Sequence, residues 1–153
     1  LYIATAAAFL LDQASKVFVL WGLNLPQVGQ IEIAPPYLNF RMAWNYGMNF
    51  GLFAQDSPMT RWILITVAMV IIGFVSIWIR YERPRKIVML AAGLLIGGAL
   101  GNVIDRAIHG AVVDFLNMSC CGINNPYAFN IADVEIFIGA VGLALFGDQK
   151  NAT

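Results

Sequence analysis

Two aspartates, Asp114 and Asp133, stand where one long apolar segment ends and the next begins. If the segments 87–109 and 131–146 cross a membrane as consecutive helices, both carboxyl groups lie at the same depth. Neither has a Lys or Arg close by in the sequence, and the connection 109–130 contains none. Two nearby carboxyl groups in a medium of low dielectric share a proton. The pair therefore predicts acid–base hydrolysis of the aspartic-protease type, at one face of a membrane.

Other interpretations of these acids remain open. Asp133 alone could stabilise the start of a helix, an effect worth about 0.3–1 kcal/mol. Glu135 points to a different helix face from Asp133 and ranks third among the candidate acids. Buried acids also serve proton relays in transporters and channels, although the chain has no internal repeat of the transporter kind. A non-catalytic scaffold is the third alternative.

Four more charged residues fall within the apolar segments, where an ionised side chain costs about 2.5 kcal/mol or more. Asp12 and Lys16 are four residues apart and can pair on one helix face, either to neutralise each other or to support a polar site. Asp105 and Arg106 are adjacent, so they point about 100° apart on a helix. We expect each of these two to reach a different neighbour and to organise the outer end of the bundle.

The composition indicates a membrane protein. Of the 153 residues, 59% are hydrophobic and 12% are charged, whereas soluble domains average about 45–50% and about 25%. The sequence predicts an all-α membrane protein, a single domain over 1–153 with a small extracytoplasmic β-sheet in the region 24–61. Its four transmembrane helices are expected at about 1–23, 62–79, 87–109 and 131–146. The net charge of zero gives no reason to expect a nucleic-acid partner.

A basic loop orients the chain. Arg80, Arg83, Arg85 and Lys86 are four of the nine basic residues, and clustered basic residues mark cytoplasmic loops. Both termini are then cytoplasmic, and 24–61 and 109–130 lie on the outer face.

The region 24–61 contains a strand pattern. Leu38, Phe40, Met42 and Trp44 alternate with more polar residues, as on a strand with one apolar face. A second short strand is expected around 31–33. In the third helix, Gly93, Gly97 and Gly101 recur every four residues, which favours close packing against another helix.

Metal and cofactor signatures are absent from the sequence. Cys120 and Cys121 are adjacent, which disfavours a disulfide between them because bridged Cα atoms lie about 5.5 Å apart. His109 is the only histidine, and no Gly-rich phosphate loop is visible. We therefore expect neither a metal nor a cofactor.

Five short motifs, in this order, resemble those of the bacterial lipoprotein signal peptidases, the type II signal peptidases. They are Leu11-Asp12-Gln13-Ala14-Ser15-Lys16, Asn45-Tyr46-Gly47-Met48-Asn49-Phe50-Gly51, Gly97-Gly98-Ala99-Leu100-Gly101-Asn102-Val103-Ile104-Asp105-Arg106, Val112-Val113-Asp114-Phe115 and Phe129-Asn130-Ile131-Ala132-Asp133. Each motif is weak alone, but five in register on four predicted helices are specific.

The resemblance implies a membrane aspartic endopeptidase of the bacterial inner membrane, with its active site at the periplasmic face. Its expected substrates are prolipoproteins that carry a diacylglyceryl group on a Cys, cut just before that Cys. Asp114 and Asp133 are implied as the catalytic pair. The matching positions that bind substrate or support the site are Asp12, Lys16, Asn45, Asn102, Asp105, Arg106 and Asn130. We expect membrane lipid as the surrounding partner and a monomeric enzyme.

Overall fold

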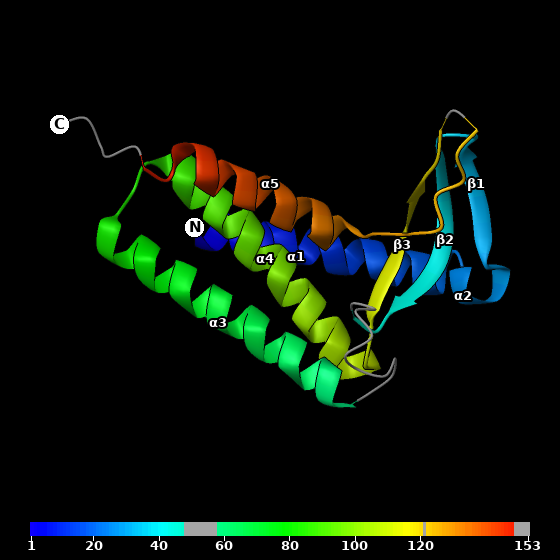
Figure 1. Cartoon of the computed structure of the whole chain (residues 1–153), viewed down its shortest axis with the longest axis horizontal. Helices are drawn as coiled ribbons and strands as arrows, with labels where there is room; N and C mark the ends of the chain where they lie inside the picture. The colour runs from blue at the N-terminus through cyan, green and yellow to red at the C-terminus, as the bar shows by residue number, and fades with distance from the viewer. Residues whose placement is uncertain (48–57, 121, 149–153) are drawn as a thin grey trace.

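The computed structural model describes residues 1–47, 58–120 and 122–148. Its long helices lie side by side, and a small sheet stands across one end of the bundle (Figure 1). In order, the elements are α1 (Tyr2–Val17), the π-helix η1 (Phe18–Gly22), α2 (Leu25–Val28), β1 (Gln30–Ala34), β2 (Leu38–Asn45), α3 (Pro58–Glu82), α4 (Lys86–His109), β3 (Val112–Met118) and α5 (Ile131–Phe146). The protein is thus mostly helical, with one three-stranded antiparallel sheet.

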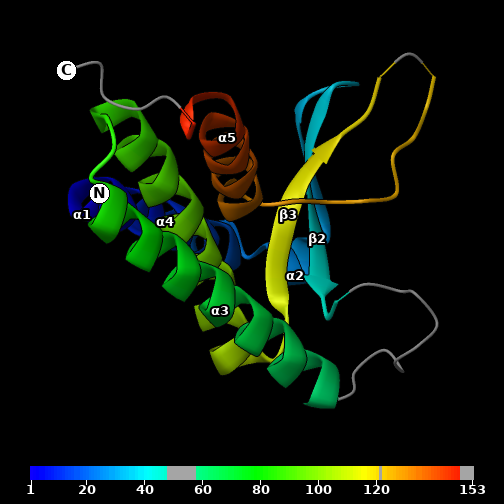
Figure 2. The same cartoon turned by 60° about the vertical axis from the view of Figure 1, so that its left-hand side comes forward.

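Three helices of the described chain are long and apolar enough to cross a membrane: Tyr2–Gly22, Met59–Glu82 and Lys86–His109. The fourth, α5, has 16 residues, so it is about 24 Å long, against the roughly 30 Å of a hydrocarbon core. It lies along α4 in both views (Figures 1 and 2). The structure therefore holds three or four membrane-type helices.

Helix ends differ from the predicted ranges mainly at α3. This helix begins at Pro58 and ends at Glu82, beyond the expected 62–79, because helical hydrogen bonding continues through polar residues outside the apolar stretch. At the end of α4, Gly110 has a φ of 83° in the left-handed region. Glycine adopts this conformation without steric cost, so it ends the helix.

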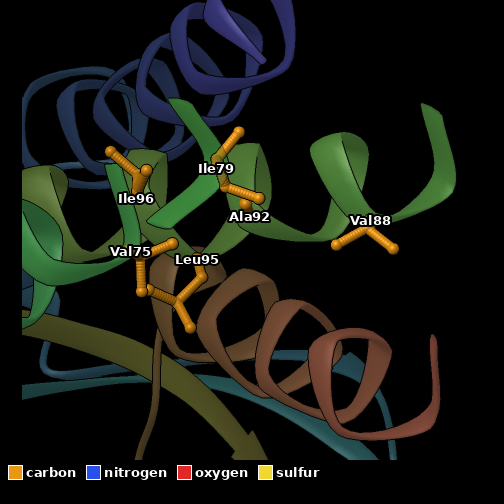
Figure 3. Packing of buried hydrophobic residues seen from close by; sticks show 6 residues of the cluster. All are labelled: Val75, Ile79, Val88, Ala92, Leu95 and Ile96. Atoms are coloured by element: carbon orange, nitrogen blue, oxygen red, sulfur yellow. The ribbon is translucent and has the colours of Figure 1, made fainter. Parts of the chain in front are cut away.

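Glycines of α4 and α5 bring three helices into close contact. A Cβ added at Gly97 would lie 2.6 Å from the Ala8 Cβ of α1, and one at Gly139 would lie 2.6 Å from the Ala91 oxygen of α4. On the other side of α4, an apolar cluster joins it to α3. Its buried members are Val75, Ile79, Val88, Ala92, Leu95 and Ile96 (Figure 3).

The sheet has the order β1-β2-β3, with β1 and β2 where the alternation predicted strands. Phe40 and Met42 of β2 pack against a second apolar cluster, formed by Val19, Leu25, Val113 and Phe115. β3 lies in the connection 109–130, outside the region 24–61 where the sheet was predicted. It is buried along most of its length, so its sequence shows no alternation of apolar and polar residues.

A bulge decides where Asp114 points. Asp114 lies between Val113 and Phe115, which both belong to the apolar cluster, so its side chain is on the opposite face of the sheet. The pairing register of β2 with β3 shifts between Phe40 and Ala43. There the amides of Phe115 and Leu116 both donate to the Phe129 oxygen. The shift lets Leu116 also pack on the apolar cluster while Asp114 faces the helices.

Cys120 is disulfide-bonded, against the expectation from adjacent cysteines, and Cys121 lies outside the described residues. In the second motif, residues 48–51 also lie outside them.

Candidate active site

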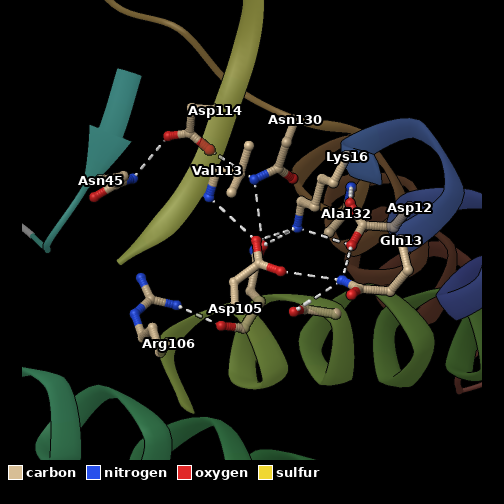
Figure 4. Close-up of polar contacts among 12 residues, drawn as sticks. Asp12, Gln13, Lys16, Asn45, Asp105, Arg106, Val113, Asp114, Asn130 and Ala132 are labelled. Carbon is tan, nitrogen blue, oxygen red and sulfur yellow. Dashed lines mark hydrogen bonds and ion pairs between the residues drawn. The ribbon is translucent and has the colours of Figure 1, made fainter. Parts of the chain in front are cut away.

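Asn130 connects the two aspartates. Its Nδ2 donates to Asp114 Oδ1 at 2.6 Å, and its Oδ1 accepts from the Asp133 amide at 2.9 Å. Its own amide donates to Asp133 Oδ2 at 3.2 Å. The residues from β3 and α5 therefore meet around one fully buried asparagine. Figure 4 shows its bond to Asp114.

The start of α5 explains this geometry. Asn130 is the N-cap residue of the helix, and Asp133 occupies the third helical position. Each side chain accepts a hydrogen bond from the other's backbone amide, which is a capping box. The capping function expected as an alternative for Asp133 is thus present, and it fixes one of the two carboxyl groups.

Two more amide side chains hold the remaining carboxylate oxygens. Asn45, the last residue of β2, donates to Asp114 Oδ2 at 3.0 Å. Asn102 of α4 donates to Asp133 Oδ1 at 3.0 Å. All four carboxylate oxygens of the pair therefore accept a hydrogen bond from a neutral donor.

Lys16 contacts residues that themselves bind the aspartate pair. Its Nζ is 2.8 Å from Asp12 Oδ2 and 2.8 Å from Asp105 Oδ2, and it donates to Asn102 Oδ1 at 3.2 Å. The three ionic side chains are almost completely buried. This cluster turns the Asn102 amide so that its Nδ2 faces Asp133.

The carboxylates beside Lys16 also position backbone atoms. Asp105 Oδ2 accepts from the Val113 amide at 3.1 Å, and Asp12 Oδ1 accepts from the Ala132 amide at 3.0 Å. Each of these amides precedes one aspartate of the pair. Arg106 lies beside them, with one guanidinium nitrogen 3.5 Å from the Asn102 oxygen (Figure 4).

The structure thus brings together all nine residues expected at the site. Sequence reasoning missed Gln13, which donates to Asp12 Oδ2 and to Asp105 Oδ1, both at 3.1 Å. Its place between Asp12 and Lys16 in an apolar helix was the available signal. Glu135, the third candidate, is buried, and neither of its carboxyl oxygens has a hydrogen-bond partner among the described residues.

The environment of Asp114 favours its protonated form. Burial, followed by the negative charge of Asp133, raises the pKa of Asp114 from 3.8 to about 7, against the smaller opposing effects of Asn45, Asn130 and Lys16. The side chain is in β3, outside the membrane-type helices, and the residue is only 2% exposed. Two acids that together bind one proton near neutral pH can act as general acid and general base.

Known proteins share this chain's sequence and fold. Residues 4–147 match the family model described as Signal peptidase (SPase) II. The chain is 41% identical over 143 residues to the lipoprotein signal peptidase of Methylorubrum extorquens (strain PA1), over 94% of this chain and 82% of that protein. It is 38% identical over 159 residues to that of Caulobacter vibrioides, over 98% and 88%.

A solved structure agrees with these sequence matches. A bacterial membrane enzyme determined by the in meso method at 2.3 Å resolution has a TM-score of 0.77 and 26% identity to the chain. The similarity covers 99% of this chain and 90% of that one. The chain therefore belongs to the signal peptidase II family, an aspartic peptidase family of multi-pass bacterial membrane proteins.

Proposed function

We propose that this protein cleaves diacylglyceryl-modified prolipoproteins just before the lipidated Cys, with Asp114 and Asp133 as its catalytic pair. The observation that carries the proposal is the Asn130 bridge, which holds carboxyl groups from two separate elements on one side chain. Asp12, Lys16, Asn45, Asn102, Asp105, Arg106 and Asn130 support or line the site.

The pair hydrolyses the peptide bond by acid–base catalysis. Asp133, as the carboxylate, takes a proton from a water molecule whose oxygen attacks the scissile carbonyl carbon. Asp114, which holds a proton near pH 7, donates it to the carbonyl oxygen. The carbon–nitrogen bond then breaks, and the amino group of the Cys leaves with a proton from the pair.

The membrane setting fits a lipid-anchored substrate. The sheet and the site lie at the end of the bundle opposite the α3–α4 connection (Figure 1). That connection carries the basic cluster 80–86, so we place it in the cytoplasm and the site at the periplasmic face. An acyl chain anchored in the bilayer then fixes the height of the scissile bond. Since all the proposed site residues belong to one chain, a monomer suffices for catalysis.

Turnover of a lipidated peptide by the purified protein tests the proposal. We expect cleavage before the lipidated Cys, and no cleavage of the same peptide without lipid. Asp114→Asn and Asp133→Asn should each abolish turnover, because an amide cannot accept the proton of the water or donate as a carboxylic acid. Asn keeps the volume of the Asp side chain, and at position 133 its amide oxygen can still accept the hydrogen bond from the Asn130 amide. Both variants should therefore remain folded, as the melting temperature would show.

The outcomes distinguish the proposed roles. Full activity in a folded Asp133→Asn protein would show that Asp133 only stabilises the start of α5, and would rule out its catalytic role. Asp148→Asn, an exposed acid at the other end of α5, is the matched control and should keep wild-type turnover.

A further inference from the structure

A polar cavity lies on the face of the sheet that carries Asp114. Its volume is about 570 Å³, within the roughly 300–1,000 Å³ of ligand sites. The lining includes Gln30, Glu32, Asn39, Arg41, Asn117 and Ser119.

The pairing register explains why this face is polar. Glu32 of β1 is opposite Asn39 of β2, and Asn39 is opposite Asn117 of β3. In the next row, Gln30 is opposite Arg41. Directly paired residues share a face, so the cavity floor spans all three strands.

The wall of the cavity is built by buried hydrogen bonds. The Asn117 side chain is 4% exposed and donates both amide hydrogens, to the Asn125 and Tyr127 oxygens, each at 2.8 Å. The Asn125 amide donates to Ser119 Oγ at 3.1 Å. These bonds hold the connection after β3 beside the floor, so the cavity has a defined shape.

Three polar side chains of the cavity have hydrogen-bonding or charged groups without a partner in the described chain. Asn39 Oδ1 is buried without a hydrogen-bond partner, which is costly for an acceptor. Glu32 and Arg41 form no ion pair with any residue of the described chain. Neutral amides, one acid and one base together suit an extended polypeptide, whose backbone offers donors and acceptors along both edges.

One face of β2 connects the cavity to the aspartate pair. Asn39, Arg41, Ala43 and Asn45 are alternate residues of β2, so they share a face. The first two line the cavity, and Asn45 donates to Asp114. At about 3.3 Å per residue, Asn39 is roughly 20 Å from Asn45, and Asn117 is roughly 10 Å from Asp114.

We propose that this cavity binds the substrate segment that follows the lipidated Cys, about three to six residues after the scissile bond. The inference rests on the proposed function. The segment before the Cys is the signal peptide, whose central part is apolar and belongs among the helices and lipid. The polar segment after the Cys is the part that can extend along β2 to Arg41 and Asn39.

The test compares two lipidated peptides, one ending directly after the Cys and one continuing for seven polar residues. For the wild type, kcat/KM should be about tenfold higher for the long peptide, mainly through a lower KM. In the Arg41→Gln and Asn39→Leu variants, the ratio of kcat/KM for the long peptide to kcat/KM for the short peptide should fall toward one. Arg80→Gln removes an exposed charge near the end of α3 that lies away from the sheet. This control variant should keep the wild-type ratio.

Each result bears on one proposal. Equal turnover of both peptides by the wild type would overturn the cavity assignment and leave the proposed function intact, whereas failure to cleave either peptide would overturn the function. A length advantage that persists in Arg41→Gln and Asn39→Leu would also overturn the cavity assignment. So would a change in the ratio on replacing phosphatidylethanolamine with phosphatidylglycerol in the bilayer, because it would identify a lipid headgroup as the occupant.

Discussion

Lys16 supports the aspartate pair without touching it. A cation in direct contact with Asp114 would favour its ionised form and lower its pKa. Instead Lys16 acts through Asn102, and its charge is the smallest of the effects on the pKa of Asp114. The neutral amide between them keeps the geometry fixed and leaves the proton on the pair.

The proton on Asp114 predicts a pH dependence. Between about pH 4 and 7 the folded protein keeps this proton, whereas the unfolded chain, with a pKa of 3.8, has released it. Stability therefore falls as pH rises through this window, by up to about 4 kcal/mol from this residue. The melting temperature of the wild type should decrease from pH 5 to 8 more steeply than that of Asp114→Asn. Turnover should fall along the same alkaline limb.

Asp148→Asn is the reference for this measurement, and its slope should match that of the wild type. Identical slopes for the wild type and Asp114→Asn would show that Asp114 is already ionised at pH 5. The limbs of the activity profile belong to the pair and not to either residue alone.

At the scale of elements, contact between α4 and α5 sets the position of Asp133. A Cβ at Gly139 would lie 2.6 Å from the Ala91 oxygen and 2.7 Å from the Leu95 nitrogen. Both neighbours are helix backbone, so the two helices must separate to admit a methyl group.

Gly139→Ala should therefore lower stability by about 1–3 kcal/mol and reduce turnover, since α5 carries Asp133. The matched control is Gly73→Ala in α3, where no atom lies within 4 Å of the added Cβ. That variant should be neutral or slightly stabilised, because Ala favours a helix more than Gly does. Melting temperature and turnover, measured together, check both variants, and equal behaviour would contradict the packing argument.

The elements were predictable from sequence to different degrees. α5 has the expected range 131–146, because its apolar run begins directly after a capping residue. β2 was visible from its alternation, whereas β3 is buried on both faces and carries no such signal. The nine candidate residues were named from motifs. Their hydrogen bonds could not be predicted, because the bulge at Phe115, which turns Asp114 toward the helices, has no readable sequence pattern.

At the scale of the molecule, the distribution of charge and the shape are consistent with the orientation proposed above. The start of α1, the end of α5 and the α3–α4 connection lie at one end of the bundle, and the sheet lies at the other (Figure 1). The basic cluster 80–86 belongs to the first end.

Cysteine labelling can check this orientation in cells, starting from a chain with Cys120 and Cys121 replaced by Ser. Tyr81 is 83% exposed at the end of α3, and Val28 is 56% exposed at the end of α2. An impermeant reagent should label Val28→Cys in intact cells and Tyr81→Cys only after permeabilisation. Labelling of Tyr81→Cys in intact cells would show that the chain has the opposite orientation in the membrane.

The capping box at Asn130 has a consequence for biosynthesis. The asparagine that caps the start of α5 also donates to Asp114, so the start of the helix and the contact between the two aspartates depend on the same residue. Because α5 follows the other helices in the chain, it is the last of them to be made. With Asp114 and Asp133 as the proposed catalytic pair, a nascent chain that already holds Asp114 in its sheet is expected to be inactive until α5 is in place.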